Sequence, residues 1–557
     1  MLFAKRVVYL ILLLGAGSVG VALLNEQTPM ARGIVRDESG PVAGAVVRLR
    51  GSAAYVQTDA QGAFRLPADS ATSDTQVTAW APGYFITGGP VSDFTGADGG
   101  TLVLRRHPTT DNPDYAFVSA LDLDNPTACA HCHRSQPGAA DAALPVDEWL
   151  LDAHAGAATN PRFLSLYNGT TIDGLLGSPT TFVFDPAQGL SVPVAPSLGA
   201  DEVGPGFRLD FPEHSGTCAT CHMPLLALQS PYQADPNQAA GAAAEGITCD
   251  FCHKIQDVRL PNPGLPGVLS LDFLRPPEDE QVFIGPFDDT PGEDIYSALQ
   301  DDSRVCAACH SGQFWDVPIY DSFGEWLRSP YSDPATGQTC QGCHMPHTGA
   351  TAFVQLPPDE MALIAPRSPD TIFSHRMPGA ADRAFLEGTA TLALETQRSG
   401  DGLRVTVRVT NSGAGHHIPT DSPLRNLILL VQAQDASGQP LALLDGPIIP
   451  AWGGEGDPAA GYYAGQPGVL YAKVLADLYT GETPTAAYWR PVRLVSDNRI
   501  PALATDETVY EFAAPTDSGA VTVNARLYLR RAFIALMDSK GWDTPDMLMA
   551  QQTASVP

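Results

Sequence analysis

The chain has 557 residues, which is too long for one compact core and favours roughly two to four domains. Its content of 44% hydrophobic and 17% charged residues is ordinary for a folded protein and excludes wholesale disorder. The formal net charge of −30 argues against nucleic acid and anionic membrane surfaces as partners. We interpret this charge mainly as a solvated surface, and attraction of a basic partner protein is the alternative.

Residues 1–31 have the features of a targeting segment. Lys5 and Arg6 precede an apolar run of 18 residues from Val7 to Leu24, as in a secretory signal peptide. The run is also nearly long enough to span a bilayer, so a retained N-terminal anchor stays open. Either way, the sequence predicts an exported protein, in the periplasm or another extracytoplasmic compartment. Its membrane contact would be limited to this segment, if the segment is uncleaved.

Residues 32–106 predict short strands separated by turns. Runs such as Ala45–Leu49 and Val77–Trp80 lie between turn signals such as Glu38–Gly40 and Asp59–Gly62. The segment resembles the carboxypeptidase regulatory-like domain, which implies a small β-sandwich with a structural or interaction role and no peptidase activity. The matching residues are Gly33, Val35, Asp37, Gly40, Pro41, Val42, Gly44, Ala45, Val46, Thr58, Asp59, Gly62, Phe64, Gly83 and Tyr84.

Residues 107–385 contain all ten cysteines, which fall into five copies of C-x-x-C-H. This pentapeptide is the attachment signature of c-type haem. Its two thiols bond to the haem vinyl groups, and the adjoining histidine supplies an axial imidazole to the iron. The predicted thioether cysteines are Cys129, Cys132, Cys218, Cys221, Cys249, Cys252, Cys306, Cys309, Cys340 and Cys343. The predicted proximal histidines are His133, His222, His253, His310 and His344.

Other uses of paired cysteines fit this pattern poorly. A disulfide framework gives no reason for a histidine after every second cysteine. Zinc sites would need matching second pairs, and every cysteine already belongs to a pentapeptide. A thioredoxin-like motif explains one such pair and not five. The sequence therefore predicts five c-type haems, each containing iron, in a pentahaem domain of short helices with little regular structure.

The sixth ligand of each iron decides between electron transfer and substrate chemistry. Subtracting the five proximal histidines from the 13 in the chain leaves eight candidates. Five of them lie near an attachment motif or in a segment whose Gly and Pro residues fix the backbone. These predicted distal ligands are His154, His214, His347, His375 and His416. Of the others, His131 is interpreted as a spacer, His107 lies at a domain junction, and His417 is expected to face away from His416.

Residues 386–530 return to strand patterns. Leu403–Val409 alternates, Asn426–Val431 is a buried-type run, and Val521–Leu529 is expected to be the last strand. A C-terminal β-sandwich is the natural inference. Residues 531–557 predict a helical tail, with a short second helix beginning at Pro545. The whole chain is thus expected to be an α+β multidomain protein.

The region from Asp122 to Met549 resembles the exported multihaem cytochromes related to the tetrahaem cytochrome of ammonia oxidisers. The similarity rests on Trp149-x4-His154 with Asn160-Pro161-x-Phe163, on Cys218 to Pro224 and Cys340 to Pro346, and on His375 to Gly379 paired with Asn411 to Thr420. The resemblance implies that His154, His375 and His416 are distal haem ligands. The group contains both electron carriers and reductases, so its activity does not carry over directly.

Two functions follow from these patterns. The favoured one is a relay of electrons between redox partner proteins, such as other cytochromes or a membrane quinol-linked complex, with no catalytic residue. The alternative is a multihaem reductase or oxidoreductase that acts on a small nitrogen or sulfur compound at one open haem. It would need a basic lining, for which Arg304 and Arg328 are candidates. Stacking of subunits into a haem filament is a third possibility, and the oligomeric state stays open.

Overall fold

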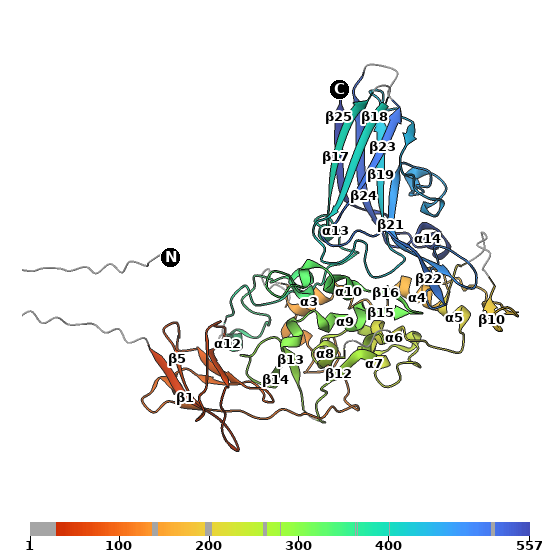
Figure 1. Cartoon of the computed structure of the whole chain (residues 1–557). Coiled ribbons are helices and arrows are strands. Elements are labelled where there is room, and N and C mark those ends of the chain that lie inside the picture. The colour runs from red at the N-terminus through yellow and green to blue at the C-terminus, as the bar shows by residue number, and fades with distance from the viewer. Residues whose placement is uncertain are drawn as a thin grey trace, which may run out of the picture.

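The computed structural model describes residues 29–557 apart from 136–142, 195–202, 260–264, 279, 362–363, 365, 400–401 and 514–518. An N-terminal β region, a central region of short helices and small sheets, and a C-terminal β region follow one another along the chain (Figure 1). This mixed content agrees with the expected α+β class. The predicted signal or anchor run, Val7–Leu24, lies outside the described residues. Within the described part of the chain, none of the helices has the length and apolar character needed to cross a bilayer.

The N-terminal β region consists of two four-stranded sheets around one core. The first contains β1 (Met30–Asp37), β2 (Gly40–Pro41), β5 (Ala63–Pro67) and β8 (Gly100–Val103). The second contains β3 (Val46–Leu49), β4 (Tyr55–Gln57), β6 (Gln76–Trp80) and β7 (Thr87–Pro90), and the short helix α1 (Ser92–Thr95) follows it. Alternation places Val47 and Leu49 in the core while Arg48 between them is only half-buried.

The central region has short helices, of which α4 is the longest with eight residues. They are α2 (Ala130–His133), α3 (Pro145–Trp149), α4 (Pro161–Asn168), α5 (Phe207–Asp210), α6 (Ala219–His222), α7 (Pro224–Ala227), α8 (Cys249–Cys252), α9 (Arg304–His310), α10 (Ser322–Leu327), α11 (Cys340–His344), α12 (Pro358–Met361) and α13 (Arg383–Leu386). Four two-stranded sheets accompany them: β9 (Phe182–Asp185) with β10 (Leu190–Pro193), β11 (Ile255–Val258) with β12 (Leu271–Phe273), β13 (Phe283–Gly285) with β14 (Asp294–Tyr296), and β15 (Gly312–Phe314) with β16 (Val317–Tyr320).

The C-terminal β region also has two sheets. One has the order β17 (Ala390–Ser399), β18 (Gly402–Asn411), β23 (Thr505–Ala513), β20 (Leu443–Asp445). The other has the order β22 (Val492–Asp497), β21 (Gly468–Asp477), β19 (Asn426–Gln434), β24 (Val521–Arg530), β25 (Met547–Val556). Buried side chains from both sheets, including Val405, Val407, Leu429 and Leu527, form its core.

The predicted helical tail 531–557 is corrected by the structure. Only α14 (Ile534–Lys540) is helical, and it ends at Gly541, which adopts the left-handed conformation. The chain then returns as β25, which pairs antiparallel with β24 from Val521 to Leu529. The final strand is therefore β25 and not Val521–Leu529. Residues such as Met547 and Leu548 favour helix by themselves, but the free edge of β24 and the burial of Met549 and Val556 favour the strand.

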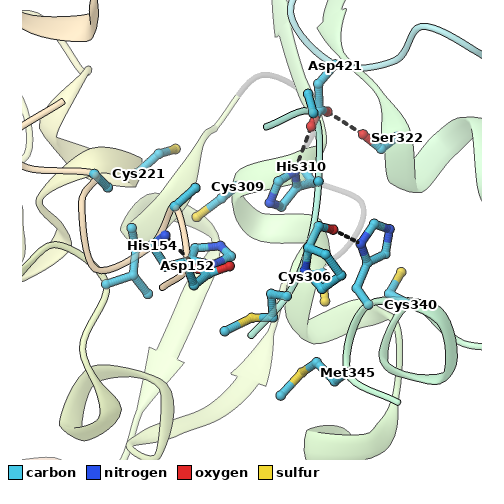
Figure 2. A pocket seen from close by; sticks show the side chains of 18 of the residues that line it. Asp152, His154, Cys221, Cys306, Cys309, His310, Ser322, Cys340, Met345 and Asp421 are labelled. Carbon is cyan, nitrogen blue, oxygen red and sulfur yellow. Dashed lines mark hydrogen bonds and ion pairs between the residues drawn. The ribbon is translucent and has the colours of Figure 1, made fainter. Parts of the chain in front are cut away.

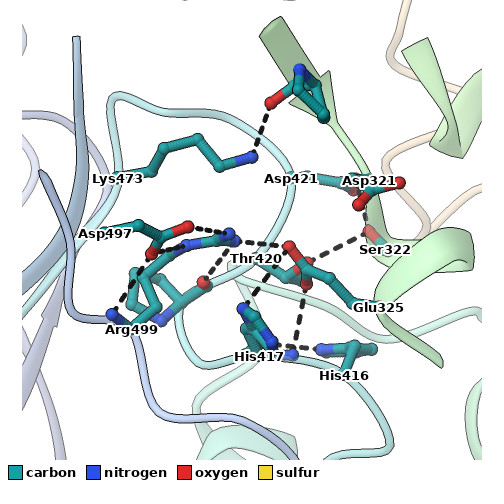
Figure 3. A network of polar contacts seen from close by, with 12 residues as sticks. Asp321, Ser322, Glu325, His416, His417, Thr420, Asp421, Lys473, Asp497 and Arg499 are labelled. Carbon is teal, nitrogen blue, oxygen red and sulfur yellow. Dashed lines mark hydrogen bonds and ion pairs between the residues drawn. The ribbon is translucent and has the colours of Figure 1, made fainter. Parts of the chain in front are cut away.

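The two β regions contact the central region in different ways. Phe85 of the N-terminal region packs with Leu274, Val282, Ile284 and Ile295 in one apolar cluster. On the C-terminal side, α14 packs against α4, where Leu166, Leu536, Met537 and Trp542 share another cluster. The C-terminal contact also includes the loop 413–422 between β18 and β19, which enters the central region (Figure 3).

Candidate cofactor-binding site

One large cavity occupies the central region. Its volume is about 1800 Å³, which exceeds the roughly 300–1,000 Å³ of an ordinary small-molecule site. All five motif histidines and nine of the ten motif cysteines line it, whereas Cys132 does not. The rest of the lining is largely apolar and aromatic. Such a space suits large, flat, apolar groups that carry their own metal.

Each C-x-x-C-H motif forms a short turn of helix. The motifs coincide with α2, α6, α8, α9 and α11. Residues three apart in a helix lie on the same side, so both sulfurs of a motif emerge together with the histidine directly after them. None of the ten cysteines, all of which are described, is in a disulfide. The thiols are therefore available for bonds to a prosthetic group.

Three of the predicted distal histidines each lie opposite a proximal histidine. The ring centres are 6.3 Å apart for His154 and His310, 6.4 Å for His253 and His375, and 6.3 Å for His344 and His416. Two imidazoles that bind one metal ion end-on at about 2 Å each have ring centres roughly 6 Å apart. These pairs come from segments distant in the sequence, and their spacing fits the axial positions of an iron.

Hydrogen bonds fix the orientation of nearly every imidazole at these centres. Nδ1 donates to a carbonyl oxygen in four proximal or distal rings besides the His310 pair: His133 to Phe353 (2.8 Å), His253 to Ile284 (2.7 Å), His344 to Pro378 (2.8 Å) and His416 to His417 (2.9 Å). His375 Nδ1 makes a longer bond of 3.2 Å to the Phe373 carbonyl. A proton held on Nδ1 leaves Nε2 as a free lone pair, which is the tautomer that a metal ligand needs.

The pair His154 and His310 differs from the others because both rings contact carboxylates. Asp152 Oδ1 lies 2.6 Å from His154 Nδ1, and Asp421 Oδ2 lies 2.9 Å from His310 Nδ1. Figure 2 shows these residues around one part of the cavity, with Cys306 and Cys309 beside them. Neither aspartate was predicted from the sequence. Asp152 lies two residues before His154, but Asp421 is 111 residues from His310, so only the fold brings it there.

Burial and charge separate the proton affinities of the histidines. Burial lowers the pKa of His222 to about 4, of His253 to about 3 and of His375 to about 4, so these rings are neutral at pH 7. The negative charge of Asp421 instead raises the pKa of His310 to about 9. Burial opposes ionisation of Asp421, but the charge and hydrogen bond of His310, the charge of Arg425 and the hydrogen bond from Ser322 together keep the pKa of this carboxyl below its usual value.

The five motifs lie side by side rather than as separate sites. Interaction with Cys129 raises the pKa of Cys249, and interaction with Cys221 raises the pKa of Cys309. Cys340 raises the pKa of Cys306 in the same way. Cysteines of different motifs are therefore neighbours in the fold. Groups bound at these motifs would be in close succession, with the His310 motif next to both the His222 and the His344 motifs.

Two predicted distal histidines are not brought to any of the five motif histidines. His214 and His347 are both exposed and neither lines the cavity. His214 precedes its motif by a turn at Gly216, whose φ is +66°. His347 packs against Phe373, with ring centres 4.7 Å apart and ring planes tilted by 42°. Closeness in sequence to an attachment motif therefore did not fix the direction of either side chain.

The His133 and His222 rings are each stacked on a phenylalanine, as the His253 ring is on Phe283. His133 stacks on Phe353 with ring centres 5.8 Å apart, and His222 stacks on Phe163 at 3.9 Å. No second histidine ring lies against either of them among the described residues. The unassigned His131 is inside its own motif, and its Nε2 is buried with no hydrogen-bond partner in the described part of the chain.

Five arginines line the cavity in an otherwise acidic protein. Two of them, Arg376 and Arg383, pair with Asp382 and Glu387 at 2.8 and 3.0 Å. Arg162, Arg425 and Arg531 come from α4 and from the C-terminal region, and no carboxylate lies within salt-bridge distance of them in the described residues. Burial, together with repulsion from the other two, lowers the pKa of Arg531 to about 10. By contrast, Arg304 and Arg328 do not line the cavity. They pair with Asp302 and Asp321 at 3.0 and 2.6 Å, at the surface.

A buried ion network holds the loop 413–422 against α10. Glu325 accepts a hydrogen bond of 2.6 Å from Arg499 and another of 2.6 Å from Thr420 (Figure 3). Arg499 also pairs with Asp497 at 2.7 Å. Because this loop carries both His416 and Asp421, the network fixes two residues that contact different motif histidines.

Comparison with solved structures finds a similar fold in a multihaem protein. A penta-heme cytochrome c552 from Thermochromatium tepidum has a TM-score of 0.50 and 19% sequence identity, covering 77% of this chain and 97% of that chain. At this identity the likeness shows the fold, which is that of a multihaem c-type cytochrome. The PapD-like domain of human CEP192 (TM-score 0.12, 8% identity, 30% and 84% covered) and the Mu homology domain of Danio rerio Fcho1 (0.11, 11%, 31% and 44%) match too weakly to support an argument. No family model and no curated protein matches the chain.

Proposed function

We propose that the chain is an exported pentahaem cytochrome that relays electrons between redox proteins. The observation that carries this proposal is the set of three imidazole pairs, each 6.3 or 6.4 Å apart, in a cavity that also contains the motif thiols. At these three centres the second histidine would leave no ligand site for a substrate, which favours electron transfer. The shared fold with a penta-heme cytochrome c552 supports the same reading.

Each C-x-x-C-H motif would hold one haem through its two cysteines and its histidine. His154, His375 and His416 would complete the axial pairs of the His310, His253 and His344 centres. The guanidinium groups of Arg162, Arg425 and Arg531 suit the carboxylate side chains of haem, because arginine binds carboxylates in a bidentate manner. A bound haem supplies a one-electron iron couple.

The protein itself contributes orientation, spacing and exclusion of water. Nδ1 hydrogen bonds keep each imidazole in the ligand tautomer, and the apolar lining keeps the centres dry. The contacts between thiols of adjacent motifs would keep neighbouring groups close enough for direct electron exchange. The formal net charge of −30 favours a basic redox partner, such as another cytochrome or a quinol-linked complex. The secretory features of residues 1–31 favour an extracytoplasmic location.

A second function is favoured by a specific observation. Neither His133 nor His222 has a second histidine ring against it in the described residues, and three arginines without carboxylate partners line the same cavity. An iron with one open position beside guanidinium groups could reduce a small nitrogen or sulfur oxyanion. The protein would then be a multihaem reductase with the other centres as its electron supply.

Haem attachment and ligand closure are both measurable. Intact mass and the pyridine haemochrome of the exported protein should give five haems per chain, and replacing both cysteines of one motif by alanine should give four. Absence of covalent haem would overturn the proposal. If the relay is correct, nitrite, hydroxylamine or sulfite leaves the spectrum of the ferric protein unchanged. A high-spin signal that shifts on their addition would favour the reductase.

A further inference from the structure

The His310 centre is the one at which both imidazoles, proximal and distal, contact carboxylates in the described structure. Asp152 accepts from the His154 ring at 2.6 Å, and Asp421 accepts from the His310 ring at 2.9 Å. At the His253 and His344 centres the corresponding acceptors are backbone carbonyls. A carboxylate is a charged and stronger acceptor than a carbonyl.

Both carboxylates are held in place by the fold. Asp152 is 1% exposed, and its Oδ1 also accepts from the His154 backbone N–H at 2.6 Å. Asp421 is 15% exposed and also accepts a hydrogen bond from the Ser322 hydroxyl. Its backbone φ is +59°, a left-handed conformation that is uncommon for residues other than glycine. Each carboxylate is thereby kept on its ring.

We propose that Asp152 and Asp421 are paired positioning residues that make the His154–His310 pair the strongest electron-donating axial set of the protein, so that the iron bound there has its most negative reduction potential. This inference rests on the proposed binding of haem. A carboxylate that draws the Nδ1 proton toward itself leaves more negative charge on the ring. A more basic ligand stabilises the ferric over the ferrous state, which lowers the potential. Low polarity around Asp152 strengthens the effect, because the charge is screened little by water.

The location of the His310 centre between other motifs means that a low potential there would affect electron flow through the protein. Cys309 packs in one cluster with Ala219 and Met223, and the Cys340 backbone N–H donates to the Ser303 hydroxyl directly before α9 at 2.9 Å, so the His310 motif adjoins the motifs of both His222 and His344. A centre of lowest potential at this junction is reduced last. Electrons would therefore collect on either side of it before they pass through, and the two carboxylates would set that threshold.

The test compares two carboxylate-to-amide variants with a matched charge control. Asp421→Asn and Asp152→Asn keep the shape of the side chain and remove the charge. Asp302→Asn is the control. It removes a carboxylate that is 41% exposed and pairs with Arg304 at the start of α9, the helix that carries His310, but that contacts no imidazole. A spectroelectrochemical titration of the holoprotein should show that the most negative midpoint shifts to a more positive value in each ring variant. The shift should be larger in the double variant, while the other midpoints and the Asp302→Asn titration stay unchanged.

Electron paramagnetic resonance identifies the centre that moves. The ring planes of His154 and His310 are 77° apart, whereas those of the other two pairs are 32° and 17° apart. The mutual angle of axial imidazoles shapes the low-spin signal, so the signal of the His310 centre should be separate from the others and should change in both variants. Asp421→Glu, which retains the charge, should restore both the signal and the midpoint.

An unchanged lowest midpoint in both ring variants, or an equal shift in Asp302→Asn, would overturn the inference. Haem content distinguishes this failure from failure of the proposed function. Five haems per chain with unaltered midpoints would reject only the role of the carboxylates, whereas a chain without covalent haem would reject both. Because the two variants act on opposite sides of one iron, failure of one variant to fold leaves the other as a complete test.

Discussion

The two β regions of this protein have similar architecture and different relations to the cavity. The N-terminal region contacts the outside of the central region, through the Phe85 cluster and through ion pairs such as Arg48 with Asp288. The C-terminal region inserts the loop 413–422 and thereby brings His416 and Asp421 to two motif histidines. The C-terminal region also contributes Arg425 and Arg531 to the cavity lining, whereas no described residue of the N-terminal region lines it. One β region thus covers the central region from outside, and the other supplies side chains to the cavity.

Among the variants that test this difference, Glu325→Ala should have the largest effect on stability and spectra. Glu325 is 1% exposed and pairs with Arg499 at 2.6 Å. Breaking a buried ion pair by removing one partner costs about 3–5 kcal/mol. We expect Glu325→Ala to lower the free energy of unfolding by that amount and also to alter the spectra of two centres, because the loop carries both His416 and Asp421. Chemical denaturation and the ferric absorption spectrum measure the two effects. A destabilised variant with unaltered spectra would show that the Glu325 network does not fix the position of loop 413–422.

Arg367 offers a matched perturbation at the N-terminal junction. It pairs with Asp289 at 2.6 Å, both side chains are buried, and Asp289 also accepts from the backbone N–H of Gly51. Arg367→Ala should cost a similar 3–5 kcal/mol. Since neither residue contacts a motif histidine, the spectra and midpoints should stay as in the unmodified protein. A spectral change as large as that of Glu325→Ala would remove the distinction between the two regions.

Lys540 tests the C-terminal contact through its pH dependence. It is fully buried in α14, and its Nζ donates to the carbonyl oxygens of Ser165 and Thr170 at 3.3 and 3.2 Å. Burial lowers the pKa of Lys540 to about 7. The ordinary value in an unfolded chain is about 10.4, so the unfolded state binds more protons between pH 7 and 10 and stability rises with pH across that window.

The size of this effect is at most about 4 kcal/mol, three pKa units at 1.36 kcal/mol each. Lys540→Met should be the more stable protein at pH 7 and should lack this part of the increase toward pH 10. Urea denaturation at pH 7, 8.5 and 10 measures the free energy of unfolding of both proteins. The contributions of other titrating groups cancel in the difference between the two. A constant difference at the three pH values would show that Lys540 does not change its protonation on folding in this range.

The smallest effect is expected at the half-exposed edge of the N-terminal contact. Arg48 and Asp288 are 18% and 15% exposed and lie 2.7 Å apart. Partly solvated pairs contribute about 0–1 kcal/mol. Arg48→Ala should therefore lower the free energy of unfolding by less than about 1 kcal/mol and leave haem content unchanged. A loss of haem in this variant would mean that the N-terminal region takes part in the cofactor site.

Much of the candidate site could be predicted from the sequence, because the chemistry of the haem-attachment motif lies within five consecutive residues. A C-x-x-C-H motif includes thiols and imidazole within five residues, so no knowledge of the fold is needed to identify it. His154, His375 and His416 were predicted from their local segments and family resemblance, and the structure brings all three to motif histidines. His214 and His347 were predicted from sequence distance alone. Such closeness gives no direction to a side chain, and both lie at the surface.

Contacts between distant segments were the part that the sequence could not provide. Asp421 and His310 are 111 residues apart, and Glu325 and Arg499 are 174 residues apart. No local pattern marks an aspartate as the partner of a distant histidine, or an arginine as the partner of a distant glutamate. The same holds for β25, where pairing with β24 outweighs the helix-forming tendency of its residues. Long-range partners depend on the complete fold.

The most direct test is the spin state of each centre when its distal histidine is removed. In the ferric holoprotein, His154→Ala, His375→Ala and His416→Ala should each convert one low-spin centre to high spin, as counted by electron paramagnetic resonance. His214→Ala and His347→Ala serve as matched controls and should leave every low-spin signal in place. Unchanged spin states in the first three variants, or a new high-spin signal in either control, would contradict the three imidazole pairs on which the account depends.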